Sequence, residues 1–302
     1  MTGQIAFILN GGAGQGVDST WLDKNRPMIE AIAAGGPISV VENGDQIRAA
    51  VEQALALRCE VIVAGGGDGT LNAVASMLVS KPIAFGVLPM GTLNHFAKDL
   101  GIPLDLPAAL QCIATGNTMS VDVAEVNGHF FLNNSSIGLY VDLVRERERQ
   151  QTRLGRGKWP AFAWALIGAM RRYPFMTVEL TMNGEAFVHR TPFVFVGNNG
   201  YRTEGLQIGQ RDGLRGGVLS VYATVRAGRW RLLSLGLRAL AGHLRQAKDF
   251  RAFTTAELRI ATGHRWLRVA TDGELRRIET PLYYRIHPRA LRVIVPGPLE
   301  DT

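Results

Sequence analysis

The sequence predicts a protein of mixed class, α/β plus all-β, in which an N-terminal parallel-sheet domain is followed by an antiparallel β-sandwich domain. Three observations predict it. Strand and helix patterns alternate over roughly the first 120 residues. Three apolar strands in that half end in glycine-rich segments. Beyond them, strand patterns separated by Asn-Gly and Asp-Gly turns predominate. We therefore expect domains at residues 1–124 and 125–302.

The composition is that of an ordinary globular chain with room for two domains. It has 302 residues, of which 46% are apolar and 20% charged. The two cysteines, Cys59 and Cys112, lie in no motif, so we expect them to be buried and the protein to be cytoplasmic. The first residues lack a basic region followed by a long apolar one, and no stretch is long enough to span a bilayer, so we expect neither a signal peptide nor a membrane span.

Charge is divided unevenly along the chain. Residues 1–125 hold six Lys and Arg against twelve Asp and Glu, whereas residues 126–302 hold 27 against 14. Such asymmetry is typical of a second half that meets an anionic partner, either a nucleic acid or a membrane surface. An arginine-rich surface with no partner has the same composition. The charge pattern alone leaves these alternatives open.

The first half reads as a series of strands followed by helices. The expected strands are residues 5–9, 37–41, 60–64 and 83–88, and the expected helices are residues 21–34, 46–57 and about 71–80. A chain with this alternation forms a parallel sheet wrapped by helices. Ligands of such sheets bind at the carboxyl ends of the strands, which is where this sequence places its glycines.

The central stretch, residues 61–72, reads VIVAGGGDGTLN. Glycines let the backbone approach a bulky anion closely, and the helix start that follows offers unpaired N–H groups to a phosphate. Asp68 could orient a hydroxyl or hold Mg²⁺. A plain strand-to-helix turn is the alternative, although one glycine is enough for that. Two further glycine segments, residues 10–16 and 89–94, also follow apolar strands, so together the three predict a site for a nucleoside triphosphate.

The second half is rich in strand patterns. The expected strands are residues 121–126, 129–133, 177–182, 186–189, 192–197, 217–224, 256–261, 266–271, 282–286 and 291–295. Helical patterns interrupt them at residues 159–172 and 229–251. The second of these has a basic face, which is compatible with a membrane surface or with core packing beside a solvated face.

One acidic turn stands out in this half. Asp272 and Glu274 follow the strand at 266–271 and are separated by Gly273. On an extended backbone both side chains would face the same side, as a pair of acids serving phosphoryl transfer requires. A hairpin turn with a solvated glutamate is the alternative.

These motifs resemble those of the diacylglycerol kinase and sphingosine kinase catalytic-domain family, in particular the soluble bacterial lipid kinases. The resemblance rests on Gly-Gly-Gly-Asp-Gly-Thr at 65–70, Pro-Met-Gly-Thr-Leu-Asn-His-Phe-Ala at 89–97 and Asp-Gly-Glu at 272–274. The segments at 10–14, 134–138 and 197–199 also resemble it. The first motif is shared with NAD kinases and phosphofructokinases, whereas the other two are similar to those of lipid kinases.

The resemblance implies ATP in a cleft between the two domains, with Mg²⁺. It implies that Glu274, Asp272 and Asp68 are catalytic, with Glu274 as the base and Asp272 as its partner or a metal ligand. Asp68 and Asp272 are the expected metal ligands. The expected nucleotide-binding residues are Asn10, Gly65, Gly66, Gly67, Asp68, Gly69, Thr70, Leu71, Asn72, Gly91, Thr92 and Asn94.

The sequence departs from the family pattern at three places. His95 stands where the family usually has Asp, and Gly11 stands where it often has Pro. Residues 214–217 replace an acidic run that holds a structural Mg²⁺ in many bacterial members. We expect that structural metal to be absent or differently bound here.

The expected function is therefore an ATP-dependent lipid kinase that phosphorylates a hydroxyl of a lipid such as diacylglycerol or a sphingoid base. The alternatives are an NAD or sugar-phosphate kinase and a nucleotide-binding, membrane-associated regulator with little catalysis. The expected partners are the lipid substrate and an anionic membrane surface to which the protein binds peripherally. No nucleic acid is expected, because the basic half lacks a recognisable motif for one, and a homodimer is left open.

Overall fold

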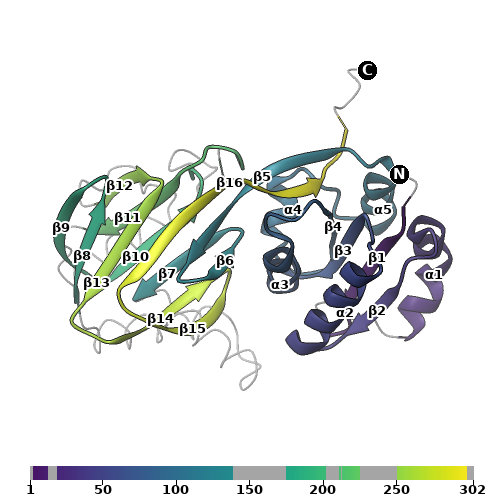
Figure 1. Cartoon of the computed structure of the whole chain (residues 1–302), viewed down its shortest axis with the longest axis horizontal. Helices are drawn as coiled ribbons and strands as arrows, with labels where there is room; N and C mark the ends of the chain where they lie inside the picture. Colours follow the sequence, from purple (N-terminus) through teal and green to yellow (C-terminus); the bar gives the residue numbers. More distant parts are fainter. Residues whose placement is uncertain are drawn as a thin grey trace, which may run out of the picture. The chain divides into compact units, whose positions relative to one another are not determined.

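The computed structural model describes residues 3–12, 19–138, 175–201, 211, 213–224 and 250–297 (Figure 1). The chain divides into two compact units. Unit 1 comprises Met1–Val123 together with His287–Thr302, and unit 2 comprises Ala124–Ile286. The division between the units falls between Val123 and Ala124, and the last residues, His287–Thr302, belong to unit 1.

Unit 1 is built on a parallel sheet of strand order β2-β1-β3-β4, to which the end of β16 adds beside β4. Its own strands are β1 (Ile5–Asn10), β2 (Ile38–Val41), β3 (Val61–Gly66) and β4 (Ala84–Pro89). All six residues of β3 are buried, which is the continuous apolar pattern of a strand covered on both faces.

The helices in the described part of this unit are α1 (Ser19–Ala33), α2 (Gly44–Ala56), α3 (Asp68–Leu78), α4 (His95–Asp99) and α5 (Leu106–Thr115). Side-chain caps fix the starts of two of them. Asn43 accepts from the N–H of Gln46 at α2, and Asp105 accepts from the N–H of Ala108 at α5. Helix α1 contacts α5, and α2 contacts α3. Cys59 and Cys112 are buried and unbonded, as expected, and burial raises the pKa of both thiols.

Unit 2 is an antiparallel β structure. One sheet has the strand order β12-β11-β10-β7-β14-β15. A second series of paired strands has the order β16-β13-β8-β9, in which the first residues of β16 pair with β13. The strands are β5 (Thr118–Val126), β6 (His129–Phe131), β7 (Asn134–Gly138), β8 (Met176–Met182), β9 (Glu185–Thr191), β10 (Phe193–Asn198), β11 (Leu219–Thr224), β12 (Phe250–Thr255), β13 (Glu257–Thr262), β14 (Trp266–Thr271), β15 (Glu274–Glu279) and β16 (Leu282–Ile294).

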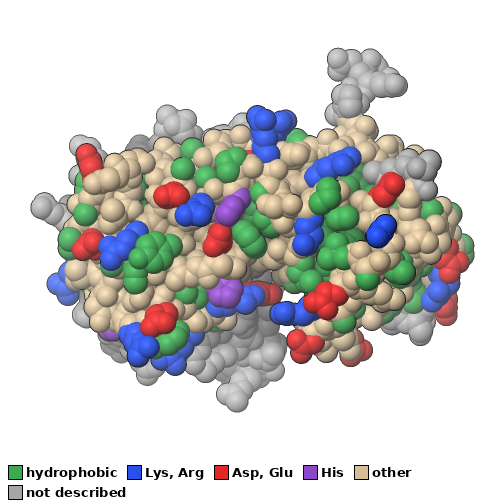
Figure 2. Space-filling view, viewed as in Figure 1, with side chains coloured by type: hydrophobic (Ala, Val, Ile, Leu, Met, Phe, Trp, Pro, Cys, Tyr) green, Lys and Arg blue, Asp and Glu red, His purple; other side chains and the backbone are tan. Residues whose placement is uncertain are grey.

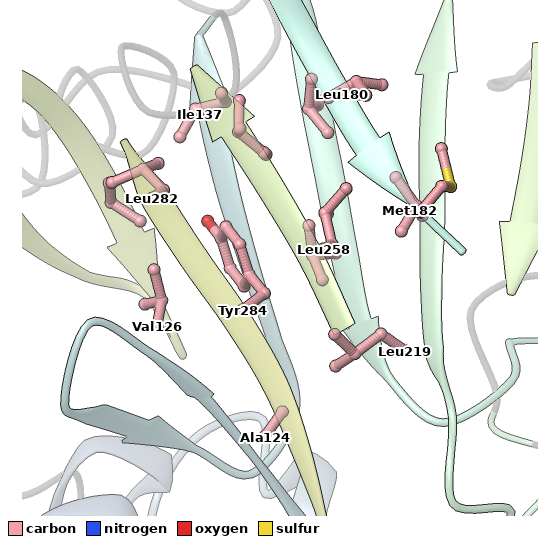
Figure 3. Packing of buried hydrophobic residues seen from close by; sticks show 14 of the residues in the cluster. Ala124, Val126, Ile137, Leu180, Met182, Leu219, Leu258, Leu282 and Tyr284 are labelled. Carbon is pink, nitrogen blue, oxygen red and sulfur yellow. The ribbon is translucent and has the colours of Figure 1, made fainter. Parts of the chain in front are cut away.

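Side chains from both series form one apolar core. Leu180, Leu258 and Tyr284 come from β8, β13 and β16, while Ile137 and Leu219 come from β7 and β11 (Figure 3). The Tyr284 hydroxyl lies 3.0 Å from the Ser135 hydroxyl of β7, so this buried phenol has a hydrogen-bond partner. Together with the structural match reported below, this arrangement confirms the predicted fold class.

Turns are present at the two Asn-Gly pairs and the Asp-Gly pair that the sequence offers as turn signals. At 127–128, 183–184 and 272–273 both central residues have positive φ, between 44° and 87°. This is the backbone of type I′ turns, and Asn-Gly and Asp-Gly pairs favour it because both residue types tolerate positive φ.

Several elements differ from the sequence expectation. Residues 282–286 and 291–295 were expected as two strands, but β16 runs through both, because Arg289 takes φ 52° and its N–H donates to the buried Asp122 carboxylate. Strands β7, β12 and β15 were not predicted. The expected helix at 159–172 lies outside the described residues, as does the helix at 229–251 except for its last two residues, which begin β12 instead.

Candidate functional site

The three glycine segments of unit 1 begin at one edge of its sheet. Leu9 of β1 pairs with Gly65 of β3, and Gly65 pairs with Leu88 of β4, so the three strands end level with one another. The chain continues from that edge as residues 10–12, 67–72 and 90–94. The predicted convergence is therefore present within unit 1 for residues 10–12 of the first segment and for the other two segments, whereas residues 13–16 lie outside the described residues.

Hydrogen bonds tie the three segments together. Asn10 donates to the Thr70 hydroxyl at 2.7 Å, which joins the first segment to the second. The Asp68 carboxylate accepts from the backbone N–H groups of His95 at 3.3 Å and Phe96 at 3.2 Å, which joins the second to the third. The Asn94 side chain accepts from the Gly91 N–H at 2.9 Å and donates to its carbonyl at 2.8 Å. These contacts hold the segments as one unit, which we call the glycine cradle (residues 10–12, 65–72 and 89–94).

Close backbone packing explains several of the glycines. A Cβ at Gly91 would lie 2.5 Å from the Cα of Gly67, and one at Gly66 would lie 2.6 Å from the Cβ of Thr70. At Gly67 a Cβ would meet only the Cα of Gly91, at 3.5 Å, which is ordinary contact. Gly67 has φ −85°, which any residue adopts. Packing thus requires glycine at 66 and 91, whereas nothing in the described structure requires it at 67.

Helix α3 begins directly at this edge. Its N-cap is Gly67, which supplies no side-chain hydrogen bond to the first turn. The first N–H groups of an uncapped helix are available to an anion, and the helix dipole favours negative charge there. The cradle therefore has the chemistry of a phosphate site.

The remaining predicted residues of unit 1 differ in accessibility. Thr92 is exposed and Asp68 is half-buried. Asn72 is buried within α3. Leu71 is fully buried and its N–H donates to the Gly67 carbonyl at 3.0 Å, so the expected nucleotide contact of Leu71 has no support in this geometry.

In unit 2, Asp272 occupies the turn between β14 and β15. Its carboxylate accepts three backbone N–H groups, from Leu132 at 2.7 Å, Asn133 at 2.8 Å and Asn134 at 3.0 Å. Burial raises its pKa to about 6, against the lowering effect of those three hydrogen bonds and of the nearby Arg211 guanidinium.

A polar network surrounds this carboxylate. The buried Arg211 donates to the Leu132 carbonyl at 2.6 Å and to the Asn133 side-chain oxygen at 2.9 Å. Asn198 donates to the same Leu132 carbonyl at 2.8 Å, and the Tyr201 hydroxyl donates to the Asn133 carbonyl at 2.9 Å. Sequence reasoning missed Arg211, Asn133 and Tyr201. The sequence offered one indication of this network, the two polar residues Asn198 and Asn199 at the end of an otherwise apolar strand.

Glu274 has a different environment from Asp272. It lies on β15, about half-exposed, and its carboxylate accepts from Arg276 at 2.7 Å. The expectation that Asp272 and Glu274 face one side of an extended backbone is wrong. Asp272 and Gly273 both have positive φ, so the chain reverses between β14 and β15, and Glu274 pairs across the turn with Thr271.

The described residues gather no three His, Cys, Asp or Glu side chains that could hold a metal. Mg²⁺ in kinases is held by one or two carboxylates together with substrate phosphates and waters. Asp68 fits that requirement, since each of its oxygens accepts only one backbone N–H. Asp272 fits less well, because three N–H groups already engage its carboxylate. Residues 214–217, where the structural Mg²⁺ was expected to be absent or differently bound, supply no carboxylate, and the nearby Asp212 lies outside the described residues.

None of the helices in the described ranges combines the length and hydrophobicity that crossing a bilayer demands.

Two protein-family models match the chain. A diacylglycerol kinase catalytic domain matches residues 4–126, and a YegS C-terminal NAD kinase beta sandwich-like domain matches residues 135–295. Among solved structures, the crystal structure of a diacylglycerol kinase from Bacillus anthracis strain Sterne has a TM-score of 0.74. It is 24% identical and covers 97% of this chain and 96% of its own. At that identity the match shows the fold.

Curated relatives match over shorter stretches. A protein of Klebsiella pneumoniae (strain 342) named "Probable lipid kinase YegS-like" is 34% identical over 171 residues, 55% of this chain and 56% of its own. One of the same name from Yersinia pestis (strain Pestoides F) is 42% identical over 110 residues, 35% of this chain and 37% of its own. The matches therefore span 56% of the first relative's length and 37% of the second's. The two family models confirm the resemblance predicted from the motifs: the chain belongs to the family that joins a diacylglycerol kinase catalytic domain to a YegS-type β-sandwich domain.

Proposed function

We propose that this protein is an ATP-dependent lipid kinase. It transfers the γ-phosphoryl group of ATP to a hydroxyl of a lipid such as diacylglycerol or a sphingoid base. The observation that carries the proposal is the glycine cradle, in which three segments converge at one sheet edge beside an uncapped helix start. The printed names of the relatives, "Probable lipid kinase YegS-like" and diacylglycerol kinase, support a lipid as the substrate class.

The cradle is suited to the phosphates of the donor. Backbone N–H groups and small side chains at the start of α3 can surround an anion without steric obstruction, since Gly67 has room for a neighbour. Catalysis of phosphoryl transfer depends mainly on positioning and on stabilising negative charge. A Mg²⁺ ion bound with the nucleotide would balance phosphate charge, and Asp68 is its proposed ligand in unit 1.

The acids of unit 2 are proposed to serve the lipid hydroxyl. Glu274 is the proposed base, because its half-exposed carboxylate has a single ion-pair partner, Arg276. Asp272 is the proposed partner of Glu274. Its hydrogen bonds to residues 132–134 fix the turn from which β15, and hence Glu274, begins. The role of Asp272 is then to position the base, with direct metal binding as the weaker alternative.

The proposed partners follow from the charge of the second half and from the substrate. A lipid substrate lies in a membrane, and arginines near an anionic surface contribute about 1 kcal/mol each to binding. We propose that the protein is cytoplasmic and associates peripherally with an anionic membrane. No described feature calls for a nucleic acid.

The test is transfer of labelled phosphate from ATP to a mixed lipid extract in the presence of Mg²⁺. The wild type is compared with Glu274→Ala and Asp68→Ala, and with Glu257→Ala as a control. Glu257 is an exposed acid that pairs only with Arg285 on another face of unit 2. We expect a labelled lipid from the wild type and the control, and at least a 100-fold lower rate from the other two.

The outcomes separate the rival functions. Label on a soluble acceptor in place of lipid would contradict the proposal and favour an NAD or sugar-phosphate kinase. Nucleotide binding without any labelled product would favour a regulator with little catalysis. Full activity of Glu274→Ala would remove Glu274 from the mechanism and leave the lipid kinase assignment intact.

A further inference from the structure

An exposed tryptophan flanked by arginines lies on the β14–β15 hairpin of unit 2. Trp266 is 41% exposed. The guanidinium groups of Arg265 and Arg277 lie 5.7 Å and 5.2 Å from the centroid of its ring, within cation–π range. We call Trp266, Arg265, Arg268 and Arg277 the Trp266 patch. Figure 2 shows blue and green side chains together at the lower left, where Figure 1 labels these two strands.

The register of the hairpin places Trp266, Arg268 and Arg277 on one face, and Arg265 directly precedes β14. Arg268 of β14 pairs directly with Arg277 of β15. Trp266, two residues before Arg268, pairs with Glu279, two residues after Arg277. Residues two apart on a strand point to the same face, so Trp266, Arg268 and Arg277 share it. The intervening residues, Leu267 and Ile278, belong to the apolar core.

This arrangement is unfavourable for the isolated protein. Like charges directly opposite on neighbouring strands are destabilising. Arg268 and Arg277 form no ion pair among the residues that the structure describes. Arg265 pairs with Glu279 at 2.9 Å, but both side chains are more than half exposed, so the pair contributes little. Packing does not require Trp266 either, because the core lies on the other face.

The chemistry of the patch fits the surface of an anionic membrane. Tryptophan is enriched at the level of lipid headgroups, where one side of the ring is apolar and the other is wet. Arginines bury their methylene chains while the guanidinium stays at the phosphates. Arg268 and Arg277 on this face, with the Arg265 guanidinium beside the ring, supply the attraction that a peripheral protein needs in addition to one inserted aromatic.

We propose that the Trp266 patch is a docking surface for an anionic lipid bilayer. This inference rests on the membrane association proposed above and assigns it to four residues. Trp266 enters the headgroup layer, and Arg265, Arg268 and Arg277 contact lipid phosphates around it.

Co-sedimentation with vesicles tests the assignment. The wild type, Trp266→Ser and the double variant Arg268→Glu/Arg277→Glu are incubated with phosphatidylcholine vesicles with and without phosphatidylglycerol. The matched control is Arg190→Glu/Arg285→Glu, which changes the net charge equally on β9 and β16, where both arginines are exposed. We expect salt-sensitive binding of the wild type to anionic vesicles, at least tenfold weaker binding of both patch variants, and less than a threefold change in the control.

A second readout reports the ring itself. Brominated lipids quench tryptophans that enter the bilayer, and Trp266→Phe should remove most of the quenching that anionic vesicles cause while retaining binding. Circular dichroism confirms that each variant is folded.

The outcomes are distinct. Equal weakening by the control would show that total charge, and not the patch, drives binding. Absence of wild-type binding to anionic vesicles, or binding to single-stranded nucleic acid alone, would overturn the patch as a lipid surface. Neither vesicle binding nor fluorescence quenching depends on kinase activity. Phosphorylation of a water-soluble short-chain diacylglycerol measures kinase activity separately. The patch variants should retain it.

Discussion

Replacing Gly91 with alanine is expected to destabilise unit 1 by about 3 kcal/mol. The new Cβ would lie 2.5 Å from the Cα of Gly67 and 2.9 Å from the Asn94 side-chain oxygen. Because one of these atoms belongs to the backbone, no side-chain rotation relieves the overlap, and two segments of the glycine cradle must separate. Thermal or urea unfolding of the purified protein measures the loss.

Gly67→Ala is the matched control for this prediction. It adds the same methyl group in the same cradle, where the nearest atom would be at an ordinary 3.5 Å. Its unfolding free energy should stay within about 1 kcal/mol of the wild type, the usual cost of a well-tolerated substitution. Equal stability of the two variants would mean that the two segments are not packed together as described.

Replacing Asp272 with asparagine is expected to lower phosphoryl transfer by at least 100-fold. The amide group would present a donor to backbone N–H groups that now donate to a carboxylate at 2.7–3.0 Å. The turn at 272–273 would then lose its hydrogen bonds to residues 132–134, and Glu274 would no longer be held in position. A steady-state assay with Glu257→Gln as control measures the effect. Wild-type turnover of Asp272→Asn would contradict the positioning role.

The same variant should change how stability depends on pH. The pKa of Asp272 is raised to about 6 in the folded chain, from about 3.9 when unfolded. Between these values the folded chain binds more protons, so stability falls as pH rises through that window. From about pH 4.5 to about pH 7 the wild type should lose about 2 kcal/mol relative to Asp272→Asn. Parallel pH profiles of the two proteins would show that this carboxylate does not titrate in that range.

The sequence was informative where chemistry follows local pattern. Apolar strands that end in glycines predicted the edge at which Gly65 and Leu88 pair, since parallel strands of similar length end level. Asn-Gly and Asp-Gly pairs predicted the three turns with positive φ, because few other residue pairs adopt that backbone.

The sequence was uninformative where a contact spans a long separation. Arg211 and Leu132 lie 79 residues apart, and neither forms a motif with the other. The fold brings them together only after β7, β10 and β14 have paired. The orientation of Asp272 depends on the same pairing, so an argument from an extended backbone could not anticipate it. The continuity of β16 likewise depends on a distant residue. Arg289 interrupts the regular strand backbone with its φ of 52°, and its N–H donates to the Asp122 carboxylate.

The central claim is that the glycine cradle binds the phosphates of ATP, and Gly67 tests it most directly. Gly67 is the N-cap of α3, and packing does not require glycine there, so alanine at this position probes the space in front of the helix with little effect on the fold. The measurement is calorimetric titration of Mg-ATP into the wild type and into Gly67→Ala, beside an unfolding experiment on both. We predict unchanged stability with at least tenfold weaker binding by Gly67→Ala, because the methyl group would occupy space that the phosphates need. Equal affinity for ATP in the two proteins would contradict the assignment of the cradle as the phosphate site.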